Sequence, residues 1–262
     1  MGRQDELRAR ARVRGLLSGD SGPRRRRSQR RGGSPGVRRY LAQLWAVAWK
    51  DLIVELRGRE RVGAMAGFTV LAGVLFNYAI DPTLVRAEDI ASGLIWMTVL
   101  FGGTLGLGRT FELEAADGAF QGVLMTPAPR DALYLGKVLS NYVIVLAVVL
   151  LVVGVFGLFF HLNWSGGLGP AVLALALGTL GFVAVGTLFA AVTSGTALGA
   201  TLLPLLLFPL LMPVVIYGTS VTGRVLAGRP LIEIQGQIRI LGAFALAALF
   251  VGATLFRYVV EE

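Results

Sequence analysis

Six long apolar segments set the strongest limit on how this chain can fold. Each is 19 to 23 residues long, five contain no Asp, Glu, Lys or Arg, and the sixth holds only Arg239 at its edge. Because an α-helix rises about 1.5 Å per residue, each segment can cross a bilayer core of about 30 Å. The segments are residues 62–80, 90–108, 138–160, 170–192, 200–221 and 238–256. The sequence therefore predicts an all-α polytopic membrane protein with six transmembrane helices.

The amino-acid composition agrees with a membrane protein and argues against an enzyme. Charged residues make up 16% of the 262 residues, whereas soluble domains carry about a quarter. The chain has no cysteine and one histidine, His161, which excludes thiol catalysis and leaves too few ligands for a metal site of its own. The spans also lack the ionisable groups that proton transfer or hydrolysis at depth requires. We expect no catalytic residue and no bound cofactor or metal.

The chain has no phosphate-binding loop with which to hydrolyse ATP. Gly136-Lys137 is followed by Val138, and Asp131 stands where the upstream glycine of such a loop is required. If the chain takes part in ATP-driven work, a separate subunit must supply the energy.

The first 39 residues differ sharply from the rest. They hold thirteen Arg against three acidic residues, whereas residues 40–262 hold twelve Lys and Arg against thirteen Asp and Glu. Residues 1–39 therefore predict a disordered Arg-rich cytoplasmic arm that is attracted to anionic membrane lipids. No aromatic residue precedes Tyr40, so stacking on bases is unsupported and we expect no nucleic-acid partner.

Residues 40–61 predict an amphipathic helix that lies along the membrane surface. Its apolar residues recur at helical spacing on one face: Leu41, Trp45, Ala48, Leu52 and Leu56. Tryptophans such as Trp45 and Trp49 suit the headgroup layer, and the basic cluster at 57–61 favours the cytoplasmic side. We call this segment the interfacial helix.

The distribution of basic residues predicts that both termini are cytoplasmic. With a cytoplasmic amino terminus, the inner segments after residue 39 carry eight Lys or Arg. The outer loops carry four, which are Arg86, Arg224, Arg229 and Arg239. Because positive residues are retained on the cytoplasmic side, this bias favours that orientation.

Small residues and prolines predict how the spans pack and bend. The pairs Gly63/Gly67 and Gly102/Gly106 have the spacing that lets two helices approach closely. The fifth span contains three prolines and is predicted to be kinked or partly unwound. These are Pro204, Pro209 and Pro213.

The segment 109–137, between the second and third spans, is too long for a simple turn. Apolar residues in 120–124 recur at helical spacing, prolines in 126–129 end that helix, and another starts at Arg130 and Asp131. An exposed amphipathic helix between two spans suits docking onto a cytoplasmic partner. A helix packed on the inner ends of the spans fits the pattern equally well.

The sequence resembles the haem exporter family called cytochrome c maturation protein B, CcmB, over about residues 41–262. In the interfacial helix the matching residues are Lys50, Asp51, Glu55 and Arg57. In the loop they are Arg109, Phe111, Glu112, Asp117, Gly118, Ala119, Gly122, Leu124, Pro127, Arg130 and Tyr134-Leu135-Gly136-Lys137. Further matches are Gly178-Thr179-Leu180-Gly181 and Val185-Gly186-Thr187-Leu188 in the fourth span, and Tyr258 to Glu262 at the end.

The resemblance implies an ABC-2-type permease domain over residues 40–262, in the bacterial inner membrane. Two copies would sit beside an ABC ATPase subunit and a haem-handling membrane partner. ATP hydrolysed on the ATPase would drive haem transfer, or release of a haem chaperone, for cytochrome c assembly. The residues that would couple to the ATPase are Glu112, Asp117, Gly118, Gly122, Arg130 and Asp131.

Two other functions remain open on the residues alone. The same arrangement serves an ABC-2 permease for a lipid-linked saccharide or a drug, and a non-transporting scaffold needs only spans that hold partners. His161, beside Trp164 at the outer end of the third span, is the one histidine that could ligate haem iron. We expect it to be an interfacial side chain instead, with haem held mainly by the partner.

Overall fold

The computed structural model of the chain describes residues 36–81, 83–116, 129–162, 164, 167–194 and 199–259. The chain divides into two compact units, Met1–Gly36 and Val37–Glu262, and the described helices belong to the second. This part of the chain is helical and contains no strand. The helices are α2 Val37–Gly58, α3 Glu60–Ala79, α4 Ala87–Ala116, α6 Arg130–Phe160, α7 Leu168–Thr193, α8 Gly199–Leu210, α9 Met212–Leu226 and α10 Gln235–Val259, with a short 3-10 helix, η1, at Leu231–Glu233.

Each segment predicted to span a membrane is helical in the structure. Five helices, α3, α4, α6, α7 and α10, are long and apolar enough to cross a membrane alone, and α8 and α9 pass the same test as a bent pair. The boundaries differ around the predicted loop, because α4 continues to Ala116 and α6 begins at Arg130. Charged helix-forming residues after 108 extend α4 past the apolar run. The loop predicted over 109–137 is therefore helical at both ends.

Prolines explain why the fifth span is two helices. Thr201–Leu210 and Met212–Leu226 meet at an angle of 62°. Pro204 and Pro209 lie inside α8, where each removes a backbone donor from the helical ladder. Pro213 lies in the first turn of α9 and has no N–H with which to continue the ladder of α8. The predicted kink is confirmed, and the bend is sharp enough to divide the span at Leu211.

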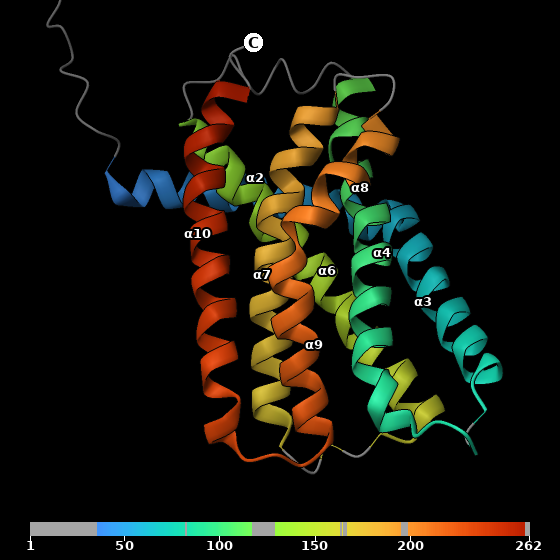
Figure 1. Cartoon of the computed structure of the whole chain (residues 1–262). Helices are drawn as coiled ribbons and strands as arrows, with labels where there is room; N and C mark the ends of the chain where they lie inside the picture. Colours follow the sequence, from blue (N-terminus) through green and yellow to red (C-terminus); the bar gives the residue numbers. More distant parts are fainter. Residues whose placement is uncertain are drawn as a thin grey trace, which may run out of the picture. The chain divides into compact units, whose positions relative to one another are not determined.

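Helix α2 runs across the bundle, whereas the other long helices run along it (Figure 1). It ends at Gly58, and Arg59 adopts a left-handed backbone conformation with φ of 55°, which turns the chain into α3. The interfacial helix predicted over 40–61 is thus shorter at its end, and Arg61 belongs to the first turn of α3. The reason is the turn at Arg59, which helical periodicity alone does not reveal.

The predicted apolar face of α2 is only partly buried against the rest of the protein. Ala48 is fully buried, whereas Leu41, Trp45 and Leu56 are more than half exposed. Trp45 stacks on Trp49 with ring centroids 6.1 Å apart, and Trp49 is also exposed. An exposed tryptophan pair on a helix that crosses the bundle suits the headgroup layer of a membrane.

Large side chains seated on glycines hold the long helices together. Trp96 of α4 lies between Gly178 of α7 and Gly218 of α9, where an added Cβ at Gly218 would be 2.6 Å from the indole ring. The indole Nε1 donates to Thr222 Oγ1 at 3.0 Å. The absence of a side chain at these glycines therefore lets the larger Trp96 side chain pack closely against both helices.

Of the two predicted glycine pairs, one packs and the other does not. Gly102 and Gly106 face α3, with Met65 and Phe68 as their neighbours. Gly63 and Gly67 have no described atom within 4 Å of an added Cβ, so this pair does not pack against the described part of the chain. Sequence spacing cannot tell an inward face from an outward one.

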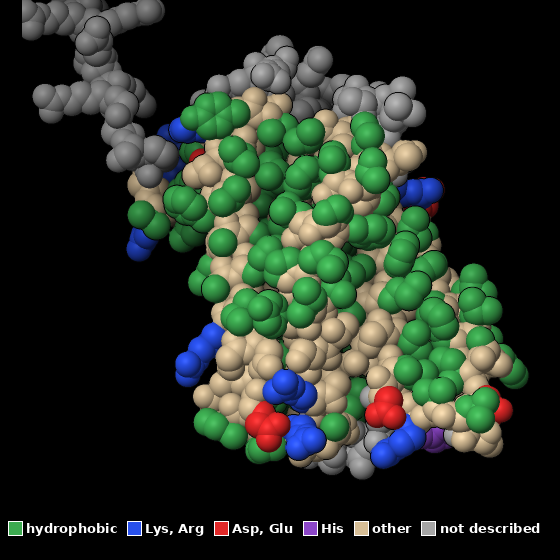
Figure 2. Space-filling model, in the orientation of Figure 1, with side chains coloured by type: hydrophobic (Ala, Val, Ile, Leu, Met, Phe, Trp, Pro, Cys, Tyr) green, Lys and Arg blue, Asp and Glu red, His purple; other side chains and the backbone are tan. Residues whose placement is uncertain are grey.

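The outer surface of the helices is apolar along most of their length. Figure 2 shows hydrophobic side chains over the middle of the bundle, with charged side chains mainly near its two ends. Large residues such as Leu71, Leu75, Leu246 and Phe250 are 60% to 73% exposed. A surface of this kind is stable against lipid rather than water, and the chain is an integral membrane protein.

Candidate functional site

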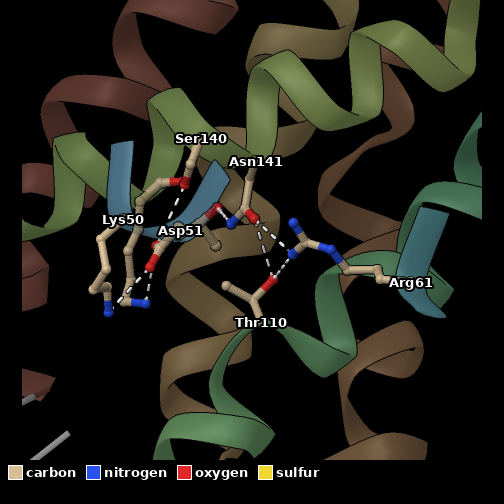
Figure 3. A network of polar contacts seen from close by, with 8 residues as sticks. Lys50, Asp51, Arg61, Thr110, Ser140 and Asn141 are labelled. Atoms are coloured by element: carbon tan, nitrogen blue, oxygen red, sulfur yellow. Dashed lines mark hydrogen bonds and ion pairs between the residues drawn. The ribbon is translucent and has the colours of Figure 1, made fainter. Parts of the chain in front are cut away.

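A network of polar side chains joins five helices near the end of the bundle where α2 lies (Figure 3). We call it the polar network. Its members come from α2, α3, α4, α6 and α7, and they are Lys50, Asp51, Glu55, Arg61, Thr110, Lys137, Ser140, Asn141 and Thr187.

Asp51 links α2 to α6. Its Oδ2 lies 3.4 Å from Lys137 Nζ and accepts a hydrogen bond from Ser140 Oγ, also at 3.4 Å. Its Oδ1 lies 3.1 Å from Lys50 Nζ. The Lys137 side chain is only 6% exposed, whereas that of Lys50 is 48% exposed. The Asp51–Lys137 pair is thus the shielded one, and shielding from water strengthens the attraction between the two charges.

Arg61 connects α2 with three spans. Its Nε lies 2.9 Å from Glu55 Oε2, and the two side chains form an ion pair. Its Nη1 donates to Thr110 Oγ1 and to Asn141 Oδ1, both at 2.9 Å. The side chains of Arg61 and Glu55 are 10% and 13% exposed. A nearly buried guanidinium therefore draws α3, α4 and α6 together.

Asn141 carries the polar network from α6 to α7. Its Nδ2 donates to Thr187 Oγ1 at 3.1 Å, and Thr110 Oγ1 donates to Asn141 Oδ1 at 3.3 Å. Asn141 and Thr187 are both buried. Without water, buried polar groups must find partners in the protein, so these contacts set how the four spans meet.

Two further contacts fix α2 on α6. The Tyr40 hydroxyl donates to Asp131 Oδ2 at 2.9 Å. Desolvation and the neighbouring Asp131 carboxylate together raise the pKa of Tyr40 to about 12. Farther along, α2 crosses α6 at Gly136, where an added Cβ would be 2.8 Å from both the Leu44 carbonyl oxygen and Val47 Cβ. Helices α2 and α6 therefore behave as one packed unit.

The structure brings together several residues that the sequence singled out. Lys50, Asp51 and Glu55 all belong to the polar network, whereas Arg57 is exposed in the last turn of α2. Arg130 and Asp131 form the first turn of α6 and are half-buried.

The rest of the predicted coupling segment is not described. Glu112 lies within α4, but its side chain is outside the description. Asp117, Gly118, Gly122 and the amphipathic helix expected over 120–124 lie outside the described residues. The docking role of these residues stays a prediction.

Sequence reasoning missed the uncharged members of the polar network. Ser140, Asn141 and Thr110 carry no charge and belong to no motif that the sequence singled out, and Thr187 was named only within the family match of the fourth span. A signal was present, since Asn141 is the only amide side chain in the segment 138–160. A polar group in an apolar run must find a partner in protein, which points to neighbouring helices.

His161 lies at the opposite end of the bundle from the polar network. It ends α6 in a left-handed backbone conformation with φ of 50°, and its side chain is exposed. Within the part of the chain that the structure describes, no three His, Cys, Asp or Glu side chains are grouped so that they could hold a metal ion.

The sequence matches one known family over nearly the whole helical unit. Residues 42–260 match the family described as CcmB protein. Curated relatives named "Heme exporter protein B", from Rhodobacter capsulatus and Paracoccus denitrificans, are 30% and 31% identical to the chain over 187 residues, which is 70% of this chain and 84% of each relative. A relative of the same name from Bradyrhizobium diazoefficiens is 26% identical over 214 residues, or 81% of this chain and 94% of that protein.

Proposed function

The chain belongs to the CcmB family, and from this we propose that it is the permease subunit of a haem exporter that acts in the biogenesis of c-type cytochromes. The observation that carries the proposal is the extent of the match. Residues 42–260 include all the spans and every member of the polar network. The proposal therefore concerns the whole transmembrane unit rather than one motif.

A separate ABC ATPase subunit would drive the transport. This sequence has no phosphate-binding loop, so energy has to enter through a contact with a partner. The start of α6 is suited to that contact, because it follows the segment 117–128 in the sequence and is bound to α2 through Asp131 and Tyr40. A displacement of Arg130 and Asp131 by the ATPase would then move α2 and α6 together.

Charge reversal at Asp117 and Arg130 tests the contact. With Asp117→Lys and Arg130→Glu combined, we expect the ATPase that co-purifies with the chain to fall about tenfold, or about 1.4 kcal/mol of binding free energy. The measurement is the amount of ATPase retained on the tagged chain, together with its ATP hydrolysis. The control combines Arg86→Glu with Asp89→Lys, which reverses two charges at the opposite end of the bundle. It should change neither the amount of ATPase retained nor its ATP hydrolysis. An intact, active complex with both loop charges reversed would show that docking occurs elsewhere.

We further propose that the subunit lies in the inner membrane with both termini cytoplasmic, as one of two copies beside a haem-handling membrane partner. The eight-to-four basic bias supports the orientation. Six crossings, with α8 and α9 counted as one span, also return the chain to the side on which α3 begins. Haem would be the cargo and ATP would bind the partner.

Reporter fusions test this orientation. A reporter joined after Glu262 or placed within 117–128 should report a cytoplasmic location. A reporter placed within 163–166 should report an external location. The physical reason is the retention of basic segments on the cytoplasmic side. An external reading after Glu262 would require an odd number of crossings and would contradict the six-span topology.

A further inference from the structure

Three arginines surround the connection between α9 and α10, at the end of the bundle opposite the polar network. Arg224 is in the last turn of α9, Arg229 follows in the connection, and Arg239 is one turn into α10. Glu233 is the only acidic residue between the first and last of them. This connection, residues 224–239, therefore carries an excess of positive charge.

Two of these arginines have no counter-charge among the residues that the structure describes. Arg224 Nη1 donates to the main-chain oxygen of Glu233 at 3.0 Å, which holds Arg224 within the connection. Arg229 and Arg239 are exposed, and neither side chain makes an ion pair or hydrogen bond with any of the described residues. Both guanidinium groups are available to an external anion.

Arg239 lies on the lipid-facing side of α10. Leu246 and Phe250, seven and eleven positions further on, share its helical face and are 68% and 73% exposed. The opposite face of α10 is buried on the bundle through Leu241 and Ala245. A charged side chain on such a face is costly unless it reaches the headgroup layer and meets a counter-charge there.

The tip of the connection is apolar. Leu231 and Ile232, in η1, are 53% and 74% exposed and lie between Arg229 and Arg239 in the sequence. Exposed apolar side chains flanked by basic ones are typical of a segment that rests at the boundary of headgroups and acyl chains. The charged groups and the apolar tip thus indicate the same depth in the membrane.

We propose that the connection 224–239 is a binding site for an anionic phospholipid. The Arg229 and Arg239 guanidinium groups contact its phosphate and headgroup, and Leu231 and Ile232 enter the acyl boundary beside it. Lipid fits better than an acidic protein, because the exposed face that starts at Arg239 continues as apolar surface along α10. This inference is independent of the transported cargo.

The absence of cysteine from the sequence allows a local test. The full chain with Ile232→Cys is labelled with a fluorophore and reconstituted in vesicles of equimolar phosphatidylcholine and phosphatidylglycerol. One lipid at a time carries a quencher at the headgroup end of an acyl chain. We expect phosphatidylglycerol to quench the label more strongly than phosphatidylcholine. A label at Leu84→Cys, in the 81% exposed tip of the α3–α4 connection, is the positional control.

Removing the arginines should remove the preference of the labelled site for phosphatidylglycerol over phosphatidylcholine. Arg239→Gln is expected to lower this preference about fivefold, the factor that corresponds to about 1 kcal/mol per basic residue at an anionic surface. Arg229→Gln with Arg239→Gln should give equal quenching by the two lipids, while Arg86→Gln leaves the preference at 232 unchanged. Equal quenching with all arginines present, or an unchanged preference in the double variant, would overturn the proposal.

Discussion

Replacing Arg61 with alanine is expected to lower the free energy of unfolding by about 3–5 kcal/mol, the usual cost of removing one partner from a buried ion pair. The change leaves the Glu55 carboxylate without its counter-charge and removes the donor that Thr110 and Asn141 share. The contacts of Arg61 with Glu55 of α2, Thr110 of α4 and Asn141 of α6 are lost together. Unfolding in mixed micelles of increasing dodecyl sulfate measures the loss.

The matched control is Lys50→Ala. Lys50 also pairs with a carboxylate of α2, but its side chain is 48% exposed, and surface pairs contribute about 0–1 kcal/mol. The double change Glu55→Gln with Arg61→Gln removes both charges and should recover part of the stability, since no buried charge is left unpaired. A loss at Arg61 no larger than that at Lys50 would show that the polar network does not hold the bundle together.

Gly178→Val is expected to destabilise the bundle by about 1–3 kcal/mol through overpacking. Its new side chain would meet the Trp96 indole, which is fully buried and fixed by its bond to Thr222. The indole cannot retreat toward α9, because Gly218 already contacts its other side. Helices α4, α7 and α9 would have to separate.

Gly154→Val in α6 is the control for this change. Gly154 is also helical, but nothing described lies within 4 Å of an added Cβ there. The two variants therefore share the change in helix propensity and differ in packing. Unfolding is followed by tryptophan fluorescence at increasing detergent concentration. If both variants unfolded at the same concentration, the close packing of Trp96 on Gly178 would be contradicted.

The spans were predictable because their cause is local. A charge-free run of about 20 residues in a chain that must satisfy its backbone in lipid has few alternatives to a transmembrane helix. The bend of the fifth span was predictable for a similar reason, because Pro204, Pro209 and Pro213 act on their own backbone. These features depend on residues that are close together in the sequence.

The site was predictable only in part because its contacts are between distant segments. Lys50, Asp51, Glu55 and Lys137 were found through a family resemblance, but it did not show that Asp51 pairs with Lys137, which is 86 positions away. The partners of Arg61 on α4 and α6 are also distant in the sequence. Which glycines pack could not be foreseen either, since the spacing of Gly63/Gly67 is the same as that of Gly102/Gly106. Tertiary packing decides both, and helical periodicity does not specify which faces meet.

As the permease subunit of a haem exporter, the chain should be required for the assembly of c-type cytochromes. The most direct test deletes its gene in the native host and measures haem covalently bound to c-type cytochromes by in-gel peroxidase staining, with b-type cytochromes as the internal control. We expect the c-type signal to disappear while the b-type spectrum persists, and expression of the intact chain to restore it. Normal c-type cytochromes in the deletion strain would contradict the account, most clearly if the export of a saccharide or drug were lost instead.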